Sequence, residues 1–325
     1  MTLAITFAAP GGPEVLEANE IDVPAPGPGE ARVRQAYAGV NYVDVYFRTG
    51  LYPVAGLPAA LGLEGSGTVA AVGPGAGDLR VGDRVAYVGQ PLGAYAAERV
   101  LPASRLVRLP EAIDLRVACA AMLRGLTAYI LLRKLTILQR GDWVLVHAAA
   151  GGLGQLATRW ARRLGLRVVG TVGSPAKAEI ARAAGTEAVL LRGEPGWVDE
   201  ARRIADGRGV RLAIDGVGGT TLAQTFRAVR PLGVVASIGQ PAGPIPPVAV
   251  EDLSYPRSIA LARPSVLACA NDPELYREGA LALFAALTDG LAVEVGAEYP
   301  LAEAARAHAD LEAGRTTGSV LLTIG

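Results

Sequence analysis

The chain has 325 residues, which is enough for two domains that each bury their own core. Its 31 basic and 31 acidic residues give a formal net charge of zero, which argues against nucleic acid or an anionic membrane as a partner. Hydrophobic residues make up 51% of the chain but never run uninterrupted for about 18 positions, so we expect a folded protein without a transmembrane helix.

The N-terminus and the cysteines bear on the cellular compartment. The first residues, Met1–Ile5, lack the basic start and the apolar run of a signal peptide. The two cysteines, Cys119 and Cys269, lie far apart in apolar surroundings, and we expect two buried free thiols and not a disulfide. Free thiols fit a reducing compartment, so a cytoplasmic location is expected.

The first 100 residues are expected to form a compact β domain. Short segments rich in strand-forming residues alternate with clusters of glycine and proline, such as residues 24–29 and 73–75. This spacing of strands and turns favours a β barrel or sandwich. The predicted strands include Ala31–Ala38, Gly67–Val72 and Arg84–Val88.

The pattern changes near residue 111, first to a buried helix over Ala118–Leu132 and then to strands alternating with helices. This alternation predicts right-handed βαβ units and a doubly wound parallel sheet over about residues 126–267. Two further helices are expected over Asp272–Asp289 and Ala302–Leu311, and the last strand, Ser319–Ile324, is expected to return to the first domain. The predicted elements of the parallel domain are the strands Trp143–His147, Leu166–Val172, Ala188–Leu191, Arg211–Asp215 and Gly233–Ile238, and the helices Gln155–Leu164, Pro175–Ala184, Trp197–Ala205 and Leu222–Val229.

A glycine-rich turn follows the first strand of this parallel domain. In a G-x-G-x-x-G frame the glycines would fall at 149, 151 and 154; the chain has Ala149, keeps Gly151 and Gly154, and adds Gly152. The turn lies between an apolar strand and an amphipathic helix, as dinucleotide binding requires, because a pyrophosphate binds at the start of such a helix. We therefore expect a dinucleotide site here, and an ordinary glycine-rich connection is the alternative.

The end of the next strand predicts which dinucleotide binds. An NAD site has an acidic residue there, which holds the ribose hydroxyls and repels a phosphate. This chain instead has Gly173, Ser174 and Lys177, and Lys177 is one of only two lysines in the sequence. A hydroxyl and an ammonium at this place predict NADPH. Arg192, at the end of the following strand, is a further candidate for the 2′-phosphate, with a solvated surface arginine as the alternative.

At these residues the sequence resembles the quinone oxidoreductase (ζ-crystallin-like) branch of the medium-chain dehydrogenase/reductase superfamily, and the match extends along the chain. The shared segments include residues 11–16, 39–44, 48–53, 61–67, 81–85, 125–129, 215–218, 263–265 and 317–319, together with the glycine-rich turn. The resemblance implies a GroES-like β-rich catalytic domain of residues 1–125 and 268–325, around a Rossmann NADPH-binding domain of residues 126–267. It also implies a cleft between the domains and a homodimer.

The composition also bears on zinc. Zinc-dependent relatives use a cysteine and a histidine as ligands in the first domain and four cysteines in a separate lobe. At the positions that correspond to those ligands, this chain has Gly39, Asn41 and Leu63, and it has two cysteines and two histidines in all. A structural four-cysteine site is impossible with this inventory, so we expect an enzyme that works without a metal.

Reduction of a quinone needs little acid–base catalysis by the protein, since hydrogen-bond donors and water are enough to stabilise the anion that forms. The candidate catalytic residues are Asn41, Tyr46, Tyr52 and Arg263. The resemblance implies that Asn41 and Tyr46 lie beside the nicotinamide and its ribose, and that Tyr52 lies at the mouth of the substrate pocket, where it can stack on a flat ring. The cofactor contacts that we expect are Asn41, Tyr46, Thr127, Gly151, Gly152, Leu153, Gly173, Ser174, Lys177, Arg192, Gly239, Gln240, Pro264, Ser265 and Ser319.

Each of these assignments has a plainer alternative. Asn41 and Tyr52 can serve turn formation and packing, and Glu64 is expected to make structural hydrogen bonds. His147 is interpreted as a core histidine, and His308 has no sequence neighbour that would make it catalytic. The predicted function is an NADPH:quinone oxidoreductase. The alternatives are an NADPH-dependent enone or alkenal reductase and a non-catalytic NADPH-binding protein, and no nucleic acid or membrane partner is expected.

Overall fold

The computed structural model describes all residues, 1–325, and the chain divides into two compact units. Unit 1 comprises Met1–Leu126 and Val266–Gly325, and unit 2 comprises Thr127–Ser265. The sequence predicts boundaries after residues 125 and 267. Both cysteines are free thiols; Cys119 is buried as expected, whereas Cys269 is only half-buried.

Unit 1 contains two β sheets. The smaller has the strand order β2-β1-β4, and the larger has the order β15-β16-β3-β5-β6-β8, with β7 also paired to β3. The C-terminal strand β16 pairs with β3 of the N-terminal segment, which confirms that the end of the chain returns to the first domain. The strands are β1 (Thr2–Phe7), β2 (Glu17–Ile21), β3 (Glu30–Val40), β4 (Ala59–Ala60), β5 (Glu64–Val72), β6 (Arg84–Val88), β7 (Glu98–Pro102), β8 (Val107–Arg108), β15 (Val295–Pro300) and β16 (Ser319–Thr323).

The helices of unit 1 include α1 (Tyr42–Arg48), which the strand-and-turn pattern did not predict. Its start is nevertheless encoded locally, because Asn41 is the N-cap and the Asp44 carboxylate accepts a hydrogen bond from the Asn41 backbone N–H at 2.8 Å. Helix α8 (Pro273–Thr288) begins at the capping residue Asp272, close to the predicted start. The others are α7 (Val266–Ala270) and α9 (Ala304–Glu312), together with α2 (Leu115–Tyr129), whose last residues fall in unit 2.

Helix α2 continues into a π-helical segment, η3 (Ile130–Lys134). Together, residues Leu115–Lys134 are long and apolar enough to cross a membrane, but 72% of this stretch is buried inside the protein. Burial of that extent is typical of the core helix of a soluble protein, so the helix is weak evidence for a membrane span.

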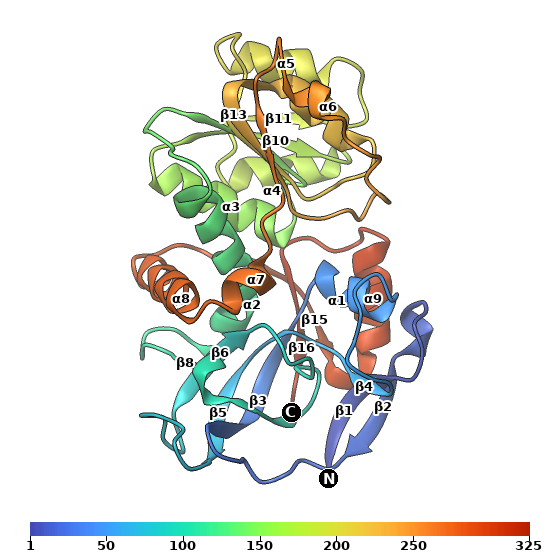
Figure 1. Cartoon of the computed structure of the whole chain (residues 1–325), viewed down its shortest axis with the longest axis vertical. Coiled ribbons are helices and arrows are strands. Elements are labelled where there is room, and N and C mark those ends of the chain that lie inside the picture. Colours follow the sequence, from blue (N-terminus) through green and yellow to red (C-terminus); the bar gives the residue numbers. More distant parts are fainter. The chain divides into compact units, whose positions relative to one another are not determined.

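Unit 2 has one six-stranded sheet in the order β11-β10-β9-β12-β13-β14, and all its strands are parallel. Helices α3 and α4 lie on one face of the sheet and α5 and α6 on the other (Figure 1). This is the predicted doubly wound sheet, with the edge strand β14 added. The elements are β9 (Trp143–His147), α3 (Gly152–Arg163), β10 (Arg167–Val172), α4 (Ala176–Ala183), β11 (Ala188–Leu191), α5 (Trp197–Ile204), β12 (Val210–Asp215), α6 (Thr221–Ala228), β13 (Val229–Ser237) and β14 (Ala260–Ala262).

The order of these strands locates a ligand site. The chain leaves β9 toward β10 on one side and reaches β12 on the other, so the strand order reverses between β9 and β12. In an open parallel sheet, ligands bind beyond the carboxyl ends of the strands at this switch point. Apolar side chains of the strands and of α5 and α6 form a core beneath it, including Leu145, Trp197, Phe226 and Val235.

Candidate functional site

The glycine-rich turn joins β9 to α3 at the switch point. The N-cap of α3 is Gly151, which has no side chain to cap the helix, and the first-turn N–H groups of a helix have no acceptor within it. A methyl group at Gly154 would lie 2.3 Å from the carbonyl oxygen of Ala148, so a side chain is excluded there. The turn therefore presents free backbone donors at an uncapped helix start, which suits a pyrophosphate.

Ala149 stands where the dinucleotide motif has its first glycine, and the structure shows why this is tolerated. Ala149 is fully buried and its methyl group faces Gly170 of β10, where an added Cβ would lie only 2.8 Å from it. The backbone N–H of Ala149 donates to the carbonyl oxygen of Thr171 at 3.0 Å. The space that a glycine at 149 would provide is thus supplied by the glycine of the neighbouring strand.

The residues predicted to bind a 2′-phosphate meet at the ends of two paired strands. Val172 of β10 lies opposite Leu191 of β11, so Gly173 and Arg192 follow at adjacent positions. The Nη2 atom of Arg192 is 3.8 Å from the place that a Cβ on Gly173 would occupy. Ser174 and Lys177 follow Gly173 along the chain and are half-buried. The structure therefore brings Arg192 to the same strand end as Ser174 and Lys177.

A second group of predicted residues lies beyond β13 and β14 in the same unit. The Arg263 guanidinium donates to the Ser237 hydroxyl at 3.0 Å and to the side-chain oxygen of Gln240 at 3.2 Å. Gly239 is buried beside Gln240, and Pro264 and Ser265 directly follow Arg263. These residues form a cluster at the carboxyl ends of β13 and β14, which is the half of the switch point opposite to the glycine-rich turn.

The candidate residues of unit 1 form an aromatic cluster on and after α1. The ring of Tyr46 contacts Tyr42 and Tyr52 at centroid distances of 5.7 and 5.4 Å, and Tyr52 also contacts Phe47 at 5.5 Å. Tyr46 is buried, whereas Tyr52 is half-buried, and the Tyr52 backbone N–H donates to the Tyr46 carbonyl oxygen. Tyr52 therefore has a ring fixed by edge contacts and part of its surface available to a ligand.

Asn41 is held by a buried ion pair. Its side-chain N–H donates to the Glu64 carboxylate at 2.8 Å. The same carboxylate accepts hydrogen bonds from the Arg124 guanidinium at 3.4 Å and from the Leu123 backbone N–H at 2.5 Å. Burial raises the pKa of Glu64, and the Arg124 charge opposes the rise. Glu64 thus makes the structural hydrogen bonds expected of it. The role of Asn41 toward a cofactor stays a prediction, because its observed bonds organise the start of α1.

His308 lies within a buried chain of polar groups that the sequence did not reveal. Arg48 can only donate, so His308 Nδ1 accepts from it at 3.2 Å and the ring proton lies on Nε2. Nε2 then donates to the Tyr95 hydroxyl at 3.1 Å, and Tyr95 donates to Asp44 Oδ2 at 3.2 Å. Burial and the charge of Arg48 lower the pKa of His308 to about 3, so it is neutral at physiological pH.

Asp44 ends this chain, next to the candidate residues of α1. Its Oδ2 atom accepts both Tyr95 and the Asn41 backbone N–H, whereas Oδ1 is buried without a hydrogen-bond partner. Burial raises the pKa of Asp44 to about 7, against the effect of these two donors. Its position three residues after the N-cap Asn41 is a capping-box signal that would have found it in the sequence.

The raised pKa of Asp44 predicts a pH-dependent cost to folding. Between the ordinary pKa of an aspartate and about 7, the folded state holds the proton and the unfolded state does not. The free energy of unfolding of the wild-type protein therefore falls as the pH rises through this range. Asp44→Asn removes the ionisation. The difference in free energy of unfolding, Asp44→Asn minus wild type, should be about 2 kcal/mol larger at pH 7 than at pH 5 when measured by urea unfolding. A difference independent of pH would show that Asp44 does not titrate in this range.

Two predicted cofactor contacts are on other elements, α2 and β16. Thr127 is half-buried in α2, at the start of unit 2. Ser319, at the start of β16, is 1% exposed and its hydroxyl donates to the Ala120 carbonyl oxygen at 2.9 Å. Its side chain therefore has a structural partner in unit 1, and a contact with a cofactor stays a prediction.

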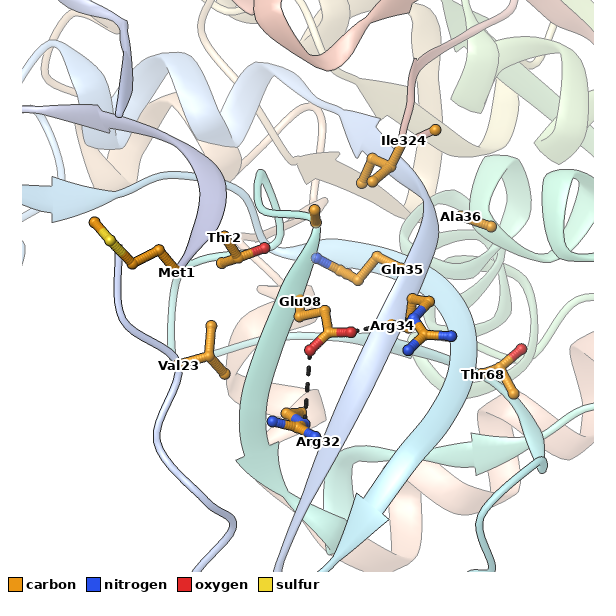
Figure 2. A pocket seen from close by; sticks show the side chains of 12 residues that line it. Met1, Thr2, Val23, Arg32, Arg34, Gln35, Ala36, Thr68, Glu98 and Ile324 are labelled. Atoms are coloured by element: carbon orange, nitrogen blue, oxygen red, sulfur yellow. Dashed lines mark hydrogen bonds and ion pairs between the residues drawn. The ribbon is translucent and has the colours of Figure 1, made fainter. Parts of the chain in front are cut away.

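A cavity of about 550 Å³ lies in unit 1. Figure 2 shows Arg32 and Arg34, which share the carboxylate of Glu98 at 3.6 and 3.1 Å. None of the candidate catalytic or cofactor residues lines this cavity. Because the charged groups already pair with one another, we assign the cavity no part in the site.

The chain does not gather metal ligands. No three histidine, cysteine, aspartate or glutamate side chains lie in an arrangement suited to a metal ion. Of the positions that the resemblance matches to zinc ligands of related enzymes, Asn41 is hydrogen-bonded to Glu64 and Leu63 is fully buried.

Two family models match the chain. The model described as an alcohol dehydrogenase GroES-like domain matches residues 27–111, and the model described as a zinc-binding dehydrogenase matches residues 152–286. The first match lies in unit 1, and most of the second lies in unit 2.

Known proteins resemble the chain along its full length. A quinone oxidoreductase of Pseudomonas aeruginosa is 43% identical, and a 2-haloacrylate reductase of a Burkholderia species is 38% identical; each match covers 99% of both chains. The crystal structure of Escherichia coli quinone oxidoreductase complexed with NADPH superposes with a TM-score of 0.95 at 37% identity, again over 99% of both chains. Sequence and fold are therefore shared with these enzymes over the whole chain.

Proposed function

Because the chain belongs to the quinone oxidoreductase branch of the medium-chain dehydrogenase/reductase superfamily, we propose that it is an NADPH:quinone oxidoreductase that works without zinc. The observation that carries the proposal is the likeness to quinone oxidoreductases, including one complexed with NADPH, along the entire chain. The cofactor, when bound, supplies electrons or hydride to the quinone, and a proton completes the hydroquinone.

The residues of unit 2 fit the proposed cofactor. The first-turn N–H groups of α3, from Gly152 and Leu153, would hold the pyrophosphate, since the helix start has no side-chain cap. Ser174, Lys177 and Arg192 would hold the 2′-phosphate with a hydroxyl and two cations, and residues 173–177 after β10 include no acidic residue. Gln240, fixed by Arg263, would lie on the nicotinamide side.

The aromatic cluster of unit 1 fits a flat acceptor. We assign Tyr52 to stack on the quinone ring, with Tyr46 and Asn41 as hydrogen-bond donors toward the reacting groups. A quinone accepts electrons readily, so the protein needs to orient it and to stabilise the negative charge that develops on its oxygen. A strong general acid is not required.

The test of the function is direct. Purified protein should oxidise NADPH in the presence of a small soluble quinone. The loss of nicotinamide absorbance measures the rate of this oxidation. No oxidation with any of a panel of benzoquinones and naphthoquinones would overturn the proposal. Binding of NADPH without turnover on any acceptor would instead identify a non-catalytic NADPH-binding protein.

A second candidate is an NADPH-dependent reductase of activated C=C bonds. It is favoured by the likeness to a 2-haloacrylate reductase over the full chain. A haloacrylate or an enone presents a polarised double bond to the same donor, so side-by-side assays with quinones and enones decide between the two. The function with the higher kcat/KM is the one to retain.

The stacking role predicts different effects for two substitutions at Tyr52. Tyr52→Phe keeps the ring and its edge contacts with Tyr46 and Phe47, so kcat/KM for the quinone should change less than about threefold. Tyr52→Ala removes the ring and should lower kcat/KM by roughly tenfold or more. Equal losses in the two variants would assign the function to the hydroxyl group instead.

Independence from zinc predicts that chelation has no effect. Dialysis against EDTA should leave the rate of NADPH oxidation and the midpoint of thermal unfolding unchanged, because no set of metal ligands is gathered in the chain. Elemental analysis of the active protein should find zinc below stoichiometric amounts. Activity that is lost on chelation and restored by zinc would contradict the prediction.

We propose also that two copies of the chain pair as a homodimer. Strand β14 is at the edge of the parallel sheet, and an open edge can pair with a second chain. The preceding segment exposes Val250 and Tyr255, at 77% and 90%, and a partner chain on this edge would cover them. Light scattering of wild type and of a Val250→Asp/Tyr255→Asp variant tests this pairing.

The cytoplasm is the compartment that we propose. Both cysteines are free thiols, and free thiols persist in a reducing environment. Fractionation of cells that produce the protein from its own gene is the measurement that decides it.

A further inference from the structure

A chain of buried polar side chains runs beneath the switch point of unit 2, and the proposed function does not use it. It consists of Thr171 on β10, His147 on β9, Thr225 on α6 and Asp215 on β12, which we call the His147 chain. All four are at most 3% exposed. Such a buried network rigidifies what it connects when every member is satisfied.

The number of protons on each side chain indicates which atom donates and which accepts in these hydrogen bonds. The Thr225 hydroxyl has one proton and contacts two groups that only accept, the Asp215 carboxylate at 3.2 Å and the Thr221 carbonyl oxygen at 2.9 Å. Donation from His147, at 2.9 Å, leaves the Thr225 proton for one of these acceptors, so we assign the imidazole proton to Nε2. Nδ1 of His147 then accepts from the Thr171 hydroxyl at 2.7 Å.

His147 keeps this arrangement over the physiological range. Burial lowers its pKa to about 4, while the charge of Asp215 opposes that shift and the charge of Arg192 adds to it. The ring of Trp197 packs edge-on against the imidazole at 5.3 Å. The histidine is therefore neutral and fixed in one tautomer and one orientation.

The two ends of the His147 chain reach opposite halves of the switch point. At one end, the backbone carbonyl of Thr171 receives the N–H of Ala149 in the glycine-rich turn. At the other end, Asp215 Oδ1 accepts the N–H groups of Val217 and Gly218, both at 2.9 Å. His147 itself is the last residue of β9, so the chain crosses the point where the strand order reverses.

The loop that Asp215 organises packs against a predicted cofactor segment. Gly218 has a φ of 71°, and a Cβ on it would lie 2.6 Å from the Cα of Gln240. The Val217 carbonyl oxygen also accepts the N–H of Ala242 at 3.0 Å. The position of Gln240 therefore depends on the loop after β12, and through Asp215 on the His147 chain.

We propose that His147, Thr225 and Asp215 are positioning residues that hold the nicotinamide-side loops in register with the glycine-rich turn, and thereby set the affinity for the whole dinucleotide. The inference rests on the proposed function, since it requires that unit 2 binds NADPH. It assigns these residues no contact with the cofactor.

Thr225→Val tests the inference, because valine matches threonine in shape but lacks the hydroxyl that joins His147 to Asp215. The dissociation constants for NADPH and NADH, measured by nicotinamide fluorescence, should both rise by a similar factor of roughly ten. Thr225→Ser keeps the hydroxyl and should stay within about twofold of wild type. Loss of NADPH affinity alone would contradict the inference, since the loops that the His147 chain holds are those expected to bind the parts common to both dinucleotides.

A stability control separates positioning from a general loss of folding. Val235→Ala removes buried side-chain volume from β13 in the same core and should lower the midpoint of thermal unfolding without changing either dissociation constant. If Thr225→Val lowers that midpoint but binds both dinucleotides as wild type does, the inference is wrong. If Thr225→Val does not fold, Thr171→Val breaks the chain at its other end and should raise both dissociation constants in the same way.

The same measurements keep the two proposals distinct. Wild-type protein that binds NADPH and reduces a quinone, with Thr225→Val binding equally well, overturns the inference and leaves the function standing. Wild-type protein that binds neither dinucleotide overturns both.

Discussion

Replacing Arg48 by methionine is expected to lower the free energy of unfolding by about 2–4 kcal/mol, because it removes the donor of a half-buried ion pair and of two other acceptors. Arg48 is only 1% exposed. Its guanidinium donates to both carboxylate oxygens of Glu312, at 2.6 and 2.9 Å, and to the Gly11 carbonyl oxygen at 3.1 Å. Methionine fills a similar volume but leaves the buried His308 Nδ1 and the half-buried Gly11 carbonyl without their donor.

Urea unfolding followed by circular dichroism measures this loss. Arg182→Met is the matched control, because Arg182 is exposed on α4 and its pair with Glu179 lies on the surface. That variant should unfold close to wild type. A loss in Arg48→Met no larger than in the control would show that the pair of Arg48 with Glu312 does not support the fold.

Arg48→Met should lower kcat/KM for the quinone by a smaller factor than it changes the equilibrium constant of unfolding. Arg48 is the last residue of α1, whereas Asn41 and Tyr46 lie at the start and within the helix. His308 and Tyr95 carry the connection from Arg48 to Asp44. Below the unfolding temperature, we therefore expect a change in kcat/KM of the quinone smaller than the change in the unfolding constant.

Lys177→Ala is expected to cost NADPH binding roughly 1.5–3 kcal/mol while leaving NADH binding nearly unchanged. Lys177 is half-buried and follows Gly173, which Arg192 approaches, by four residues along the chain. A 2′-phosphate would meet these cations there, and NADH has no group at that position. The lost affinity corresponds to a rise in the dissociation constant of roughly ten- to a hundredfold.

Titration with both dinucleotides checks this expectation. Lys134→Ala is the control, because Lys134 is the other lysine of the chain and its ammonium lies over the Tyr129 ring at 5.7 Å. Raising the salt concentration should narrow the gap between wild type and Lys177→Ala, since salt screens a partly exposed ion pair. Equal losses of NADPH and NADH affinity in Lys177→Ala would reject the phosphate assignment.

The parallel unit was largely predictable because its elements are encoded locally. Strands β9 and β11 have the bounds predicted for them, and the glycines at 165 and 185 end their helices with φ of 78° and 103°. Hydrophobic runs and glycine positions are properties of short segments, so they can be read without the rest of the fold. The edge strand β14 was missed because its three residues carry no pattern of their own.

In unit 1 the helix α1 and the buried polar chains escaped prediction. Their members come from distant segments: Arg48 and His308 are 260 residues apart, and Asn41 and Glu64 are 23 apart. A sequence shows each such residue as an isolated polar side chain, and only burial reveals that it must have a partner. Glu64 was interpreted correctly as structural, whereas the chain around His308 was not anticipated.

By itself, the sequence determined the doubly wound sheet, the glycine-rich turn and the hydroxyl and ammonium groups that follow β10, because strand-to-helix turns and their flanking residues are contiguous. Only the tertiary structure decided that Arg192 joins Ser174 and Lys177, since the pairing of β10 with β11 brings it there. It also explained Ala149, whose methyl group occupies space left by Gly170 on the neighbouring strand. Contacts between strands depend on register and packing, and these form only when the whole unit folds.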